Sequence, residues 1–319
     1  MSASLQIALA QIAPVWLNRA ATTAKILAAI EEASKQGAQL VAFGEALLPG
    51  YPFWLEHTDA ARFESAQQKR WYALYREQAV CIERGDLSAI CRLAAQKHIA
   101  VALGSIEAPS NRGGSCYASA VYINGTGEIE SVHRKLMPTY EERLAWAIGD
   151  GNGLVTHACG PFTVGVLNCW ENWMPLARAA MYAQGENLHV AIWPGNLRNT
   201  VDITRFMARE GRSYVMSVSG LMRASDIPDH LPEAGLLKEK LPKTMANGGS
   251  CIAAPDGEWL IEPICDREVV QSAEIVLDKV WQERQNFDPC GHYSRPDVLR
   301  LQLNRERQQT LTDDTSRES

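Results

Sequence analysis

The sequence predicts an α/β fold with a mixed sheet or sheets and helices outside. Short apolar runs alternate with segments of helical periodicity as far as residue 220, and hairpin patterns follow. Several runs are almost continuously apolar, as expected of strands covered on both faces. No linker rich in Pro, Gly or Ser and no internal repeat divides the chain. We therefore expect one domain over 1–300, and a polar tail over 301–319 that we expect to be mobile.

The first half of the chain alternates strands and helices. Residues 5–14 form an apolar run that Pro14 halts, and 18–37 have apolar residues at helical spacing with a stop at Gly37. Asp86 is a candidate N-cap for a helix over 86–97. Further strands are predicted at 38–45 and 99–106, a further helix at 61–80, and two strands joined by an Asn-Gly-containing turn at 115–135.

The second half begins with the same alternation and ends in hairpins. Pro175 is well placed near the start of a helix over 174–185. A Pro-Asp-Gly turn within 250–262 predicts a hairpin. Strands are also predicted at 162–169, 188–195, 214–220 and 268–278, and a helix at 202–213.

Composition excludes several classes of protein. The net charge is −6, and no basic patch interleaved with aromatic residues is visible, which argues against binding of nucleic acid. No apolar run approaches the roughly 20 residues that a membrane helix needs. The first residues lack the positive region of a signal peptide, so we expect a cytoplasmic protein.

The eight cysteines form no CxxC pair and follow no zinc-binding spacing. We therefore expect no metal site and no cofactor. In a reducing compartment most of these thiols should be free and packed as small apolar groups. At most about one of them is expected to have a chemical role.

Three apolar strands end in residues that carry reactive groups. The stretch VAFGE ends in Glu45, IESVHRK ends in Lys135, and VGVLNC ends in Cys169. Ligands of α/β folds bind at strand ends. A free thiol is mostly protonated at neutral pH, with a pKa near ~8.5. A carboxylate can take its proton, and an ammonium can stabilise the negative charge that develops on an attacked C=O or C≡N group.

Longer motifs around these residues resemble the nitrilase superfamily and, more narrowly, its true nitrilase branch. They are FGEALLPGYP (43–52), HRKLMPTYEERLAW (133–146), the segment 168–195 beginning NCWENWMP, and DPCGHYSRPD (288–297). The resemblance implies a catalytic triad of Glu45, Lys135 and Cys169, with Glu142 as an additional active-site glutamate. The Cys-Trp-Glu sequence that begins at Cys169 is typical of the nitrilase branch.

The resemblance also implies an architecture and a reaction. The fold would be a four-layer αββα sandwich that dimerises to αββααββα, and larger spirals of dimers are common in the branch. The substrate would be a small-molecule nitrile. Cys169 would attack the nitrile carbon to give a thioimidate, and water would convert this to a thioester and then to the carboxylic acid, with release of ammonia. A backbone N–H near Trp170 would be an oxyanion donor.

Aromatic residues gather near the motifs, and a mostly apolar pocket would suit an aryl or alkyl nitrile. We expect Tyr51, Trp146, Trp170 and Trp193 to form part of its wall. His133 shares a strand with Lys135, and we interpret it as structural or as a neighbour of the site.

Three other functions stay open at this stage. An amidase or N-carbamoyl amidohydrolase would use the same triad, although the Trp-Glu pair after the cysteine speaks against it. A metal-dependent nitrile hydratase would need clustered cysteines, which this chain lacks. A non-catalytic assembly protein that retains the fold would not need an intact triad.

Overall fold

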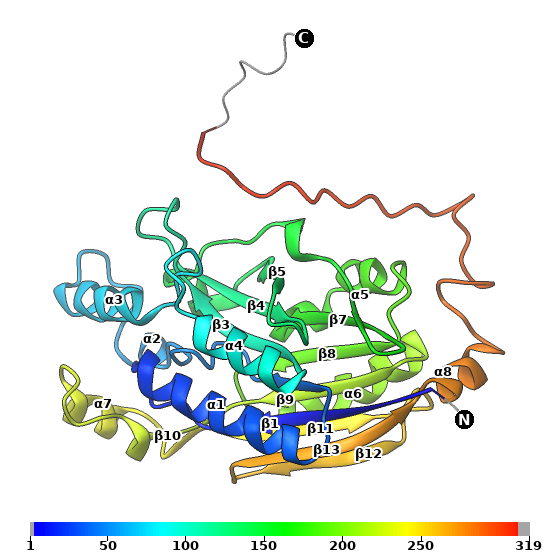
Figure 1. Ribbon diagram of the computed structural model, residues 1–319. Coiled ribbons are helices and arrows are strands. Elements are labelled where there is room, and N and C mark those ends of the chain that lie inside the picture. The colour runs from blue at the N-terminus through cyan, green and yellow to red at the C-terminus, as the bar shows by residue number, and fades with distance from the viewer. Residues whose placement is uncertain (1–2, 312–319) are drawn as a thin grey trace.

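The computed structural model describes residues 3–311 and contains two β-sheets packed face to face, with helices on their outer faces (Figure 1). The first sheet contains β1 (Ser4–Gln11), β2 (Leu40–Phe43), β3 (Ala100–Glu107), β4 (Tyr117–Ile123), β5 (Ile129–Arg134) and β13 (Val269–Val276), in the order β13-β1-β2-β3-β4-β5.

The second sheet has seven strands. They are β6 (His157–Cys159), β7 (Phe162–Asn168), β8 (Leu188–Trp193), β9 (Tyr214–Ser219), β10 (Leu221–Arg223), β11 (Thr244–Ala253) and β12 (Trp259–Cys265). The order is β10-β11-β9-β8-β7-β6, and β12 pairs with β11. Parallel pairing holds the centre of each sheet together, through β1, β2 and β3 in one and β7, β8 and β9 in the other.

Helices complete the four layers, which confirms the predicted αββα sandwich. They are α1 (Arg19–Lys35), α2 (Trp54–His57), α3 (Ala66–Gln78), α4 (Ser88–Lys97), α5 (Pro175–Tyr182), α6 (Leu197–Gly211), α7 (Ala234–Lys240) and α8 (Leu277–Arg284). The cluster of buried side chains that contains Ile26 and Ile90 packs α1 and α4 against the first sheet, and the cluster that contains Ile203 packs α6 against the second.

The alternation of side chains along β2 explains its uninterrupted apolar sequence. Leu40 and Ala42 belong to the core between the sheets, whereas Val41 and Phe43 pack beneath the helices. Successive side chains of a strand point to opposite faces, so a strand in a middle layer needs apolar residues at every position. The six residues of β8 are likewise all buried, and all are apolar except His189.

Some predicted boundaries shift. The helix expected at 61–80 begins only at Ala66, because the Ser65 side chain caps it. Helix α6 begins five residues before the predicted position 202. The expectation that Asp86 is an N-cap was wrong: Leu87 occupies that position, and the Asp86 carboxylate accepts the Cys81 N–H at 2.8 Å and pairs with Arg84.

After α8 the chain continues to residue 311 without further helix or strand and runs along the outside of the molecule (Figure 1). Residues 303–308 nevertheless contact the domain. Leu303 packs against a buried cluster, Arg307 pairs with Asp150 at 3.0 Å, and Gln308 donates to Gly149 O at 3.0 Å. A mobile tail over 301–319 stays a prediction, and its residues 312–319 lie outside the described part of the chain.

Among the helices of the described residues, none combines the length and the apolar character required to cross a membrane.

Candidate active site

Glu45, Lys135 and Cys169 come from three separate segments and meet in the interior. Glu45 follows β2, and its N–H donates to the Trp193 carbonyl of the other sheet at 3.0 Å. Lys135 follows β5, and Cys169 follows β7 at the start of a 3-10 helix over Cys169–Trp173. The three residues are 2%, 1% and 3% exposed. The strand-end positions noted in the sequence therefore converge across the two sheets.

The Lys135 ammonium lies between two carboxylates. Its Nζ is 2.9 Å from Glu45 Oε1 and 2.7 Å from Glu142 Oε2. Carboxylate oxygens of Glu45 and Glu142 and the Cys169 sulfur all lie within 4.8 Å of one another. The Lys135 ammonium, two carboxyl groups and one thiol thus lie together in a space from which water is excluded.

Three donors hold Glu142 in place. It accepts hydrogen bonds from Lys135, from the Tyr51 hydroxyl at 2.8 Å and from the Thr139 N–H at 2.6 Å. The last bond belongs to the capping box of a 3-10 helix over Tyr140–Leu144. The structure thus brings Glu142 to Lys135, as the resemblance implies.

Glu45 is less constrained. Among the described residues no hydrogen-bond donor is aligned with either of its oxygens, although the Lys135 ion pair lies close by. Burial raises the pKa of Glu45 to about 8, against the opposing charge of Lys135. A carboxylate with free lone pairs and a high affinity for protons is suited to take a proton from a neighbouring thiol.

The Cys169 thiol and the Lys135 ammonium are both protonated at rest. Burial raises the pKa of Cys169 well above its ordinary value, and the positive charge of Lys135 only partly offsets this. Burial on its own would lower the pKa of Lys135, but Cys169, Glu45 and Glu142, in their ionised forms, raise it overall. The ammonium is therefore permanently available to stabilise negative charge.

The backbone at Cys169 has an unusual conformation, with a φ of 48°. A residue other than glycine rarely occupies this left-handed region, and such residues are frequent at active sites. The Trp170 N–H points to the sulfur and lowers the pKa of Cys169, against the larger effect of burial. The Asn172 side chain supports the turn by donating to Cys169 O at 2.8 Å.

Of the partners of this turn, sequence reasoning considered only His133, as structural or as a neighbour of the site. Asn172 Oδ1 is 2.8 Å from His189 Nε2, and His189 Nδ1 is 2.7 Å from Glu186. Glu171 accepts from the Asn168 N–H and lies 3.0 Å from His133 Nε2. His189 stands in an apolar run, Glu171 and Asn172 follow the motif cysteine, and Glu186 lies in a polar loop. None of these positions indicates which way a side chain points.

The four aromatic residues expected in a pocket have different surroundings. Tyr51 and Trp146 pack edge to face at 5.4 Å, and the Lys135 ammonium lies 5.2 Å from the Trp146 ring centre. Trp193 is buried in one cluster with Cys169. Trp170 is 51% exposed and packs against Trp173 at the surface. Three of the four thus border the ionisable cluster, and the pocket itself stays a prediction.

The chemistry of the cluster does not favour a bound metal ion. Glu45, Glu142 and Cys169 are close enough to share an ion. The Lys135 ammonium, however, already neutralises these carboxylates at hydrogen-bond distance and would repel a second cation.

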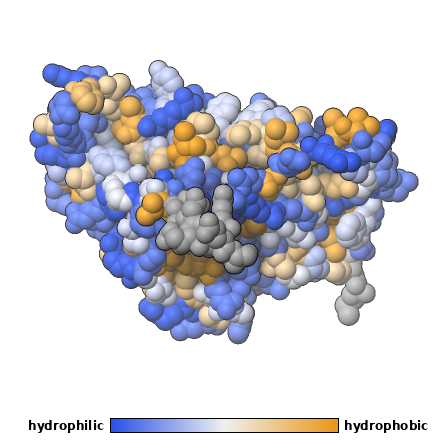
Figure 2. All heavy atoms as spheres, turned by 90° about the horizontal axis from the view of Figure 1, so that it is seen from above, coloured by the Kyte–Doolittle hydropathy of each residue, from blue (hydrophilic) through white to orange (hydrophobic). Residues whose placement is uncertain are grey.

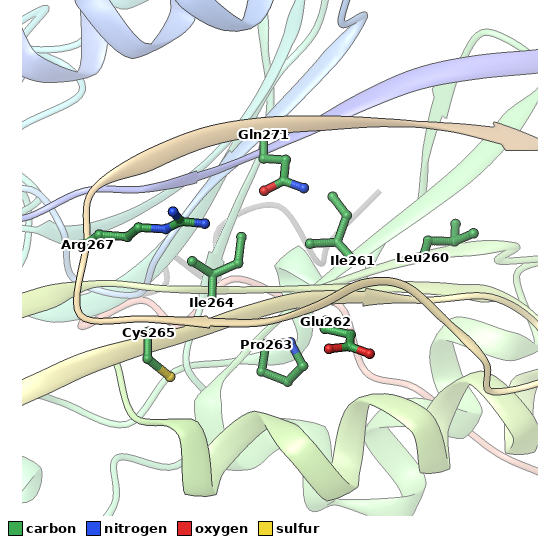
Figure 3. A pocket seen from close by; sticks show the side chains of 8 residues that line it. All are labelled: Leu260, Ile261, Glu262, Pro263, Ile264, Cys265, Arg267 and Gln271. Atoms are coloured by element: carbon green, nitrogen blue, oxygen red, sulfur yellow. The ribbon is translucent and has the colours of Figure 1, made fainter.

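A large surface hollow lies elsewhere in the molecule. Figure 3 shows it between β12 and β13, where the side chains of Ile261, Ile264 and Gln271 project into the space between the two strands. None of its lining residues is a predicted site residue, so we do not connect it with the chemistry at Cys169.

Comparison with known proteins gives concordant results. Residues 6–285 match the carbon-nitrogen hydrolase family model. The chain is 34% identical to Nitrilase 2 from an unknown prokaryotic organism, with 94% of this chain and 92% of the relative covered. It is also 34% identical to an aliphatic nitrilase of Rhodococcus rhodochrous (94% and 79% covered) and to an arylacetonitrilase of Aspergillus kawachii (94% and 92%).

Solved structures of low sequence identity share the fold. A carbon-nitrogen hydrolase from Helicobacter pylori G27 superposes with a TM-score of 0.68 at 18% identity, covering 92% of this chain and 96% of that one. A mutant of the Nesterenkonia AN1 amidase, from the nitrilase superfamily, gives 0.63 at 18% identity, covering 90% and 96%. At this identity the likeness supports the αββα architecture alone.

Proposed function

The chain belongs to the carbon-nitrogen hydrolase family, in its nitrilase branch, and from this premise we propose that it hydrolyses an organic nitrile to the carboxylic acid and ammonia. The observation that carries the proposal is the buried contact of Lys135 with Glu45 and Glu142 beside the Cys169 sulfur. These groups suffice for covalent attack on a carbon–nitrogen bond without a cofactor.

The first half of the proposed reaction forms a covalent intermediate. Glu45 takes the thiol proton of Cys169 while the sulfur attacks the nitrile carbon. Glu45 then delivers this proton to the nitrile nitrogen, which gives a thioimidate. Lys135 stabilises the charge that develops on this nitrogen. Its two carboxylate contacts fix the ammonium in the absence of substrate, so little reorganisation is required during the attack.

The second half consumes two water molecules. The first adds to the thioimidate carbon, ammonia leaves, and a thioester remains. The second, activated by Glu45 or Glu142, releases the carboxylic acid and restores the thiol. During both additions Lys135 and the Trp170 N–H stabilise the tetrahedral oxygen. Of the two glutamates, Glu45 is the better candidate base, because three donors already bind Glu142.

An amidase or N-carbamoyl amidohydrolase is the alternative, since the same groups hydrolyse amides. The identity to named nitrilases over 94% of the chain favours the nitrile. Which nitrile is preferred depends on the pocket, for which Tyr51, Trp146, Trp170 and Trp193 remain the proposed wall.

The test uses purified protein, a panel of aryl, arylaliphatic and aliphatic nitriles, and the corresponding amides, with ammonia and amide measured. We expect ammonia from at least one class of nitrile.

The nucleophile is tested by substitution. In Cys169→Ala, turnover should fall by more than about 10⁴-fold while the fold persists, because the nucleophile is absent. Cys91→Ala, which alters a half-buried thiol of α4, is the control and should keep its activity. Rapid amide hydrolysis without nitrile turnover would instead favour the amidase.

We further propose that copies of the chain associate as homodimers or larger spirals. Four large apolar side chains are exposed near α5 and α6: Trp173, Met174, Leu176 and Phe206. Figure 2 shows apolar surface clusters among polar side chains on one face of the molecule. Exposed apolar groups of this kind mark interaction sites more often than isolated ones do.

A cytoplasmic location is also part of the proposal. All eight cysteines are free thiols. Free thiols persist in reducing compartments, where disulfides are rare.

A further inference from the structure

Glu171 lies in the 3-10 helix that Cys169 begins, and it contacts two different segments of the site. Its Oε2 accepts the N–H of Asn168, the residue before the nucleophile, at 2.8 Å. Its Oε1 accepts the N–H of Leu136, the residue after Lys135, at 2.5 Å. One side chain thus joins the segment of the thiol to the segment of the ammonium.

An ordinary role at the end of a helix explains only half of this arrangement. Glu171 is the third residue of a capping box with Asn168, which accounts for the bond to the Asn168 N–H. The capping box requires no contact with Leu136, which is 35 residues away in the sequence. It also requires no partner on β5, yet both Glu171 oxygens lie within 3.1 Å of His133 Nε2.

The surroundings of Glu171 hold the carboxylate ionised and fixed. The residue is 1% exposed, and His133 is 2% exposed. Burial would raise the pKa of Glu171, but His133 and the two backbone N–H groups lower it overall. A buried carboxylate that accepts this many hydrogen bonds is held rigidly, because every alternative position leaves a charge unpaired in the interior.

From this geometry we propose that Glu171 is a positioning residue that joins the Lys135 and Cys169 segments and so sets the separation between ammonium and sulfur. His133 orients the carboxylate from β5. The inference rests on the proposed roles of Lys135 and Cys169. It explains why a glutamate stands two residues after the nucleophile: the side chain is long enough to reach both backbone N–H groups.

The decisive variant is Glu171→Asp, which keeps the charge and withdraws the carboxylate by about 1.5 Å, one carbon–carbon bond. It cannot bind Asn168 and Leu136 together. We expect kcat to fall about 10- to 100-fold with KM changed less, because small displacements of catalytic groups are costly. Glu130→Asp is the matched control, since it shortens the other His–Glu pair that involves β5, with His157 at 2.8 Å, and contacts neither segment.

A second measurement does not depend on nitrile turnover. The rate at which iodoacetamide labels Cys169 is followed against pH by peptide mass spectrometry. The charged groups that face this sulfur are Lys135, Glu45 and Glu142. If the bridge fixes Lys135 near the sulfur, Glu171→Asp moves the labelling profile to higher pH by about 1 unit, the lower end of the effect of a close opposite charge.

The direction in which the labelling profile moves along the pH axis shows whether Glu171 acts by positioning Lys135 or only through its own negative charge. Glu171 itself raises the pKa of Glu45 through its negative charge, so removal of that charge would favour ionisation in the site. Glu171→Gln has the native length but cannot accept at both ends, and it decides the matter if Glu171→Asp does not fold. We expect its kcat to fall as well, although its charge effect alone would move the labelling profile to lower pH.

Several results would overturn the inference. The first is a Glu171→Asp variant with the kcat and the Cys169 labelling profile of the wild type. The second is a Glu171→Gln variant with the kcat of the wild type. The third is a loss of kcat in Glu130→Asp as large as that in Glu171→Asp. If the wild-type protein hydrolyses no nitrile, the proposed function fails, while the labelling profiles still report on the bridge.

Discussion

At the scale of single residues, the site depends on buried charges that neutralise one another. Lys135 is 1% exposed, and an unpaired ammonium at this depth would be strongly unfavourable. Glu142, 2.7 Å away, provides countercharge, and Glu45, 2.9 Å away, adds to it when it ionises. Burial, more than the nearby Glu45 and Glu142, raises the pKa of Cys169 and keeps the thiol protonated until a substrate is attacked.

This electrostatic balance predicts how the rate depends on pH. Glu45, with a pKa of about 8, is mostly protonated at neutral pH and cannot then accept the thiol proton. As pH rises through about 8, Glu45 ionises, so kcat/KM should rise about tenfold per unit from about pH 6 and level off above about pH 8. Initial rates of ammonia release test this, and circular dichroism at each pH controls for unfolding. A kcat/KM that stays constant over this range would contradict a base with a raised pKa.

The sequence could identify some of these residues and not others. Glu45 and Cys169 follow apolar strands, Lys135 follows the more polar β5, and all three lie within recognisable motifs. Glu142 is distinguished from Glu141 only by its motif position, although the structure separates them clearly, since Glu142 is buried and bound to Lys135. The bridge by Glu171 depends on which way one side chain points between two loops, and no periodicity in the sequence encodes that direction.

At the scale of elements, strands covered on both faces were the most predictable feature. Their continuous apolar runs correspond to β2, β3, β8 and β9, all fully buried. Elements without a sequence prediction of their own are short or polar. Strands β6 and β10 have three residues each, and the seven-residue α7 has only two buried positions. Pairing with a neighbouring strand or packing in the assembled domain, rather than local sequence, stabilises such elements.

The approach of β3 to the end of β2 gives an element-scale prediction. A Cβ atom at Gly104 would lie 2.1 Å from Gly44 O and 2.6 Å from Glu45 Cα. Backbone must therefore move in Gly104→Ala, and we expect a loss of about 1–3 kcal/mol in the free energy of unfolding together with a lower kcat, because Glu45 is displaced.

Chemical denaturation and ammonia release measure the two effects. Gly114→Ala is the matched control, since nothing lies within 4 Å of its Cβ position, and it should remain within about 0.5 kcal/mol of the wild type. If Gly104→Ala were equally harmless, the contact between β3 and the Glu45 segment would not determine where the base lies.

At the scale of the whole molecule, the two sheets matter because the active site belongs to both. Glu45 and Lys135 follow strands of the first sheet, and Cys169 follows a strand of the second. The core between the sheets fixes their separation, and close packing transmits any change there to the site. The sequence alone predicts strands and their order along the chain. Strand-end positions and complementary chemistry suggest that these distant residues meet, and the family resemblance implies the triad.

The same scale includes the proposed self-association. Leu176 is 70% exposed, and Trp173, Met174 and Phe206 are each more than a third exposed. If a second copy covers this surface, light scattering will give a mass of at least twice 35.2 kDa. Leu176→Lys should then shift the mass towards 35.2 kDa, because a charge buried in an apolar interface is unfavourable. The free energy of unfolding of the single chain should stay within about 0.5 kcal/mol of the wild-type value.

Leu260→Lys, on β12 and 44% exposed, is the control and should leave the mass unchanged. A wild-type mass of 35.2 kDa would exclude self-association under those conditions, and equal effects of both substitutions would place the contact elsewhere.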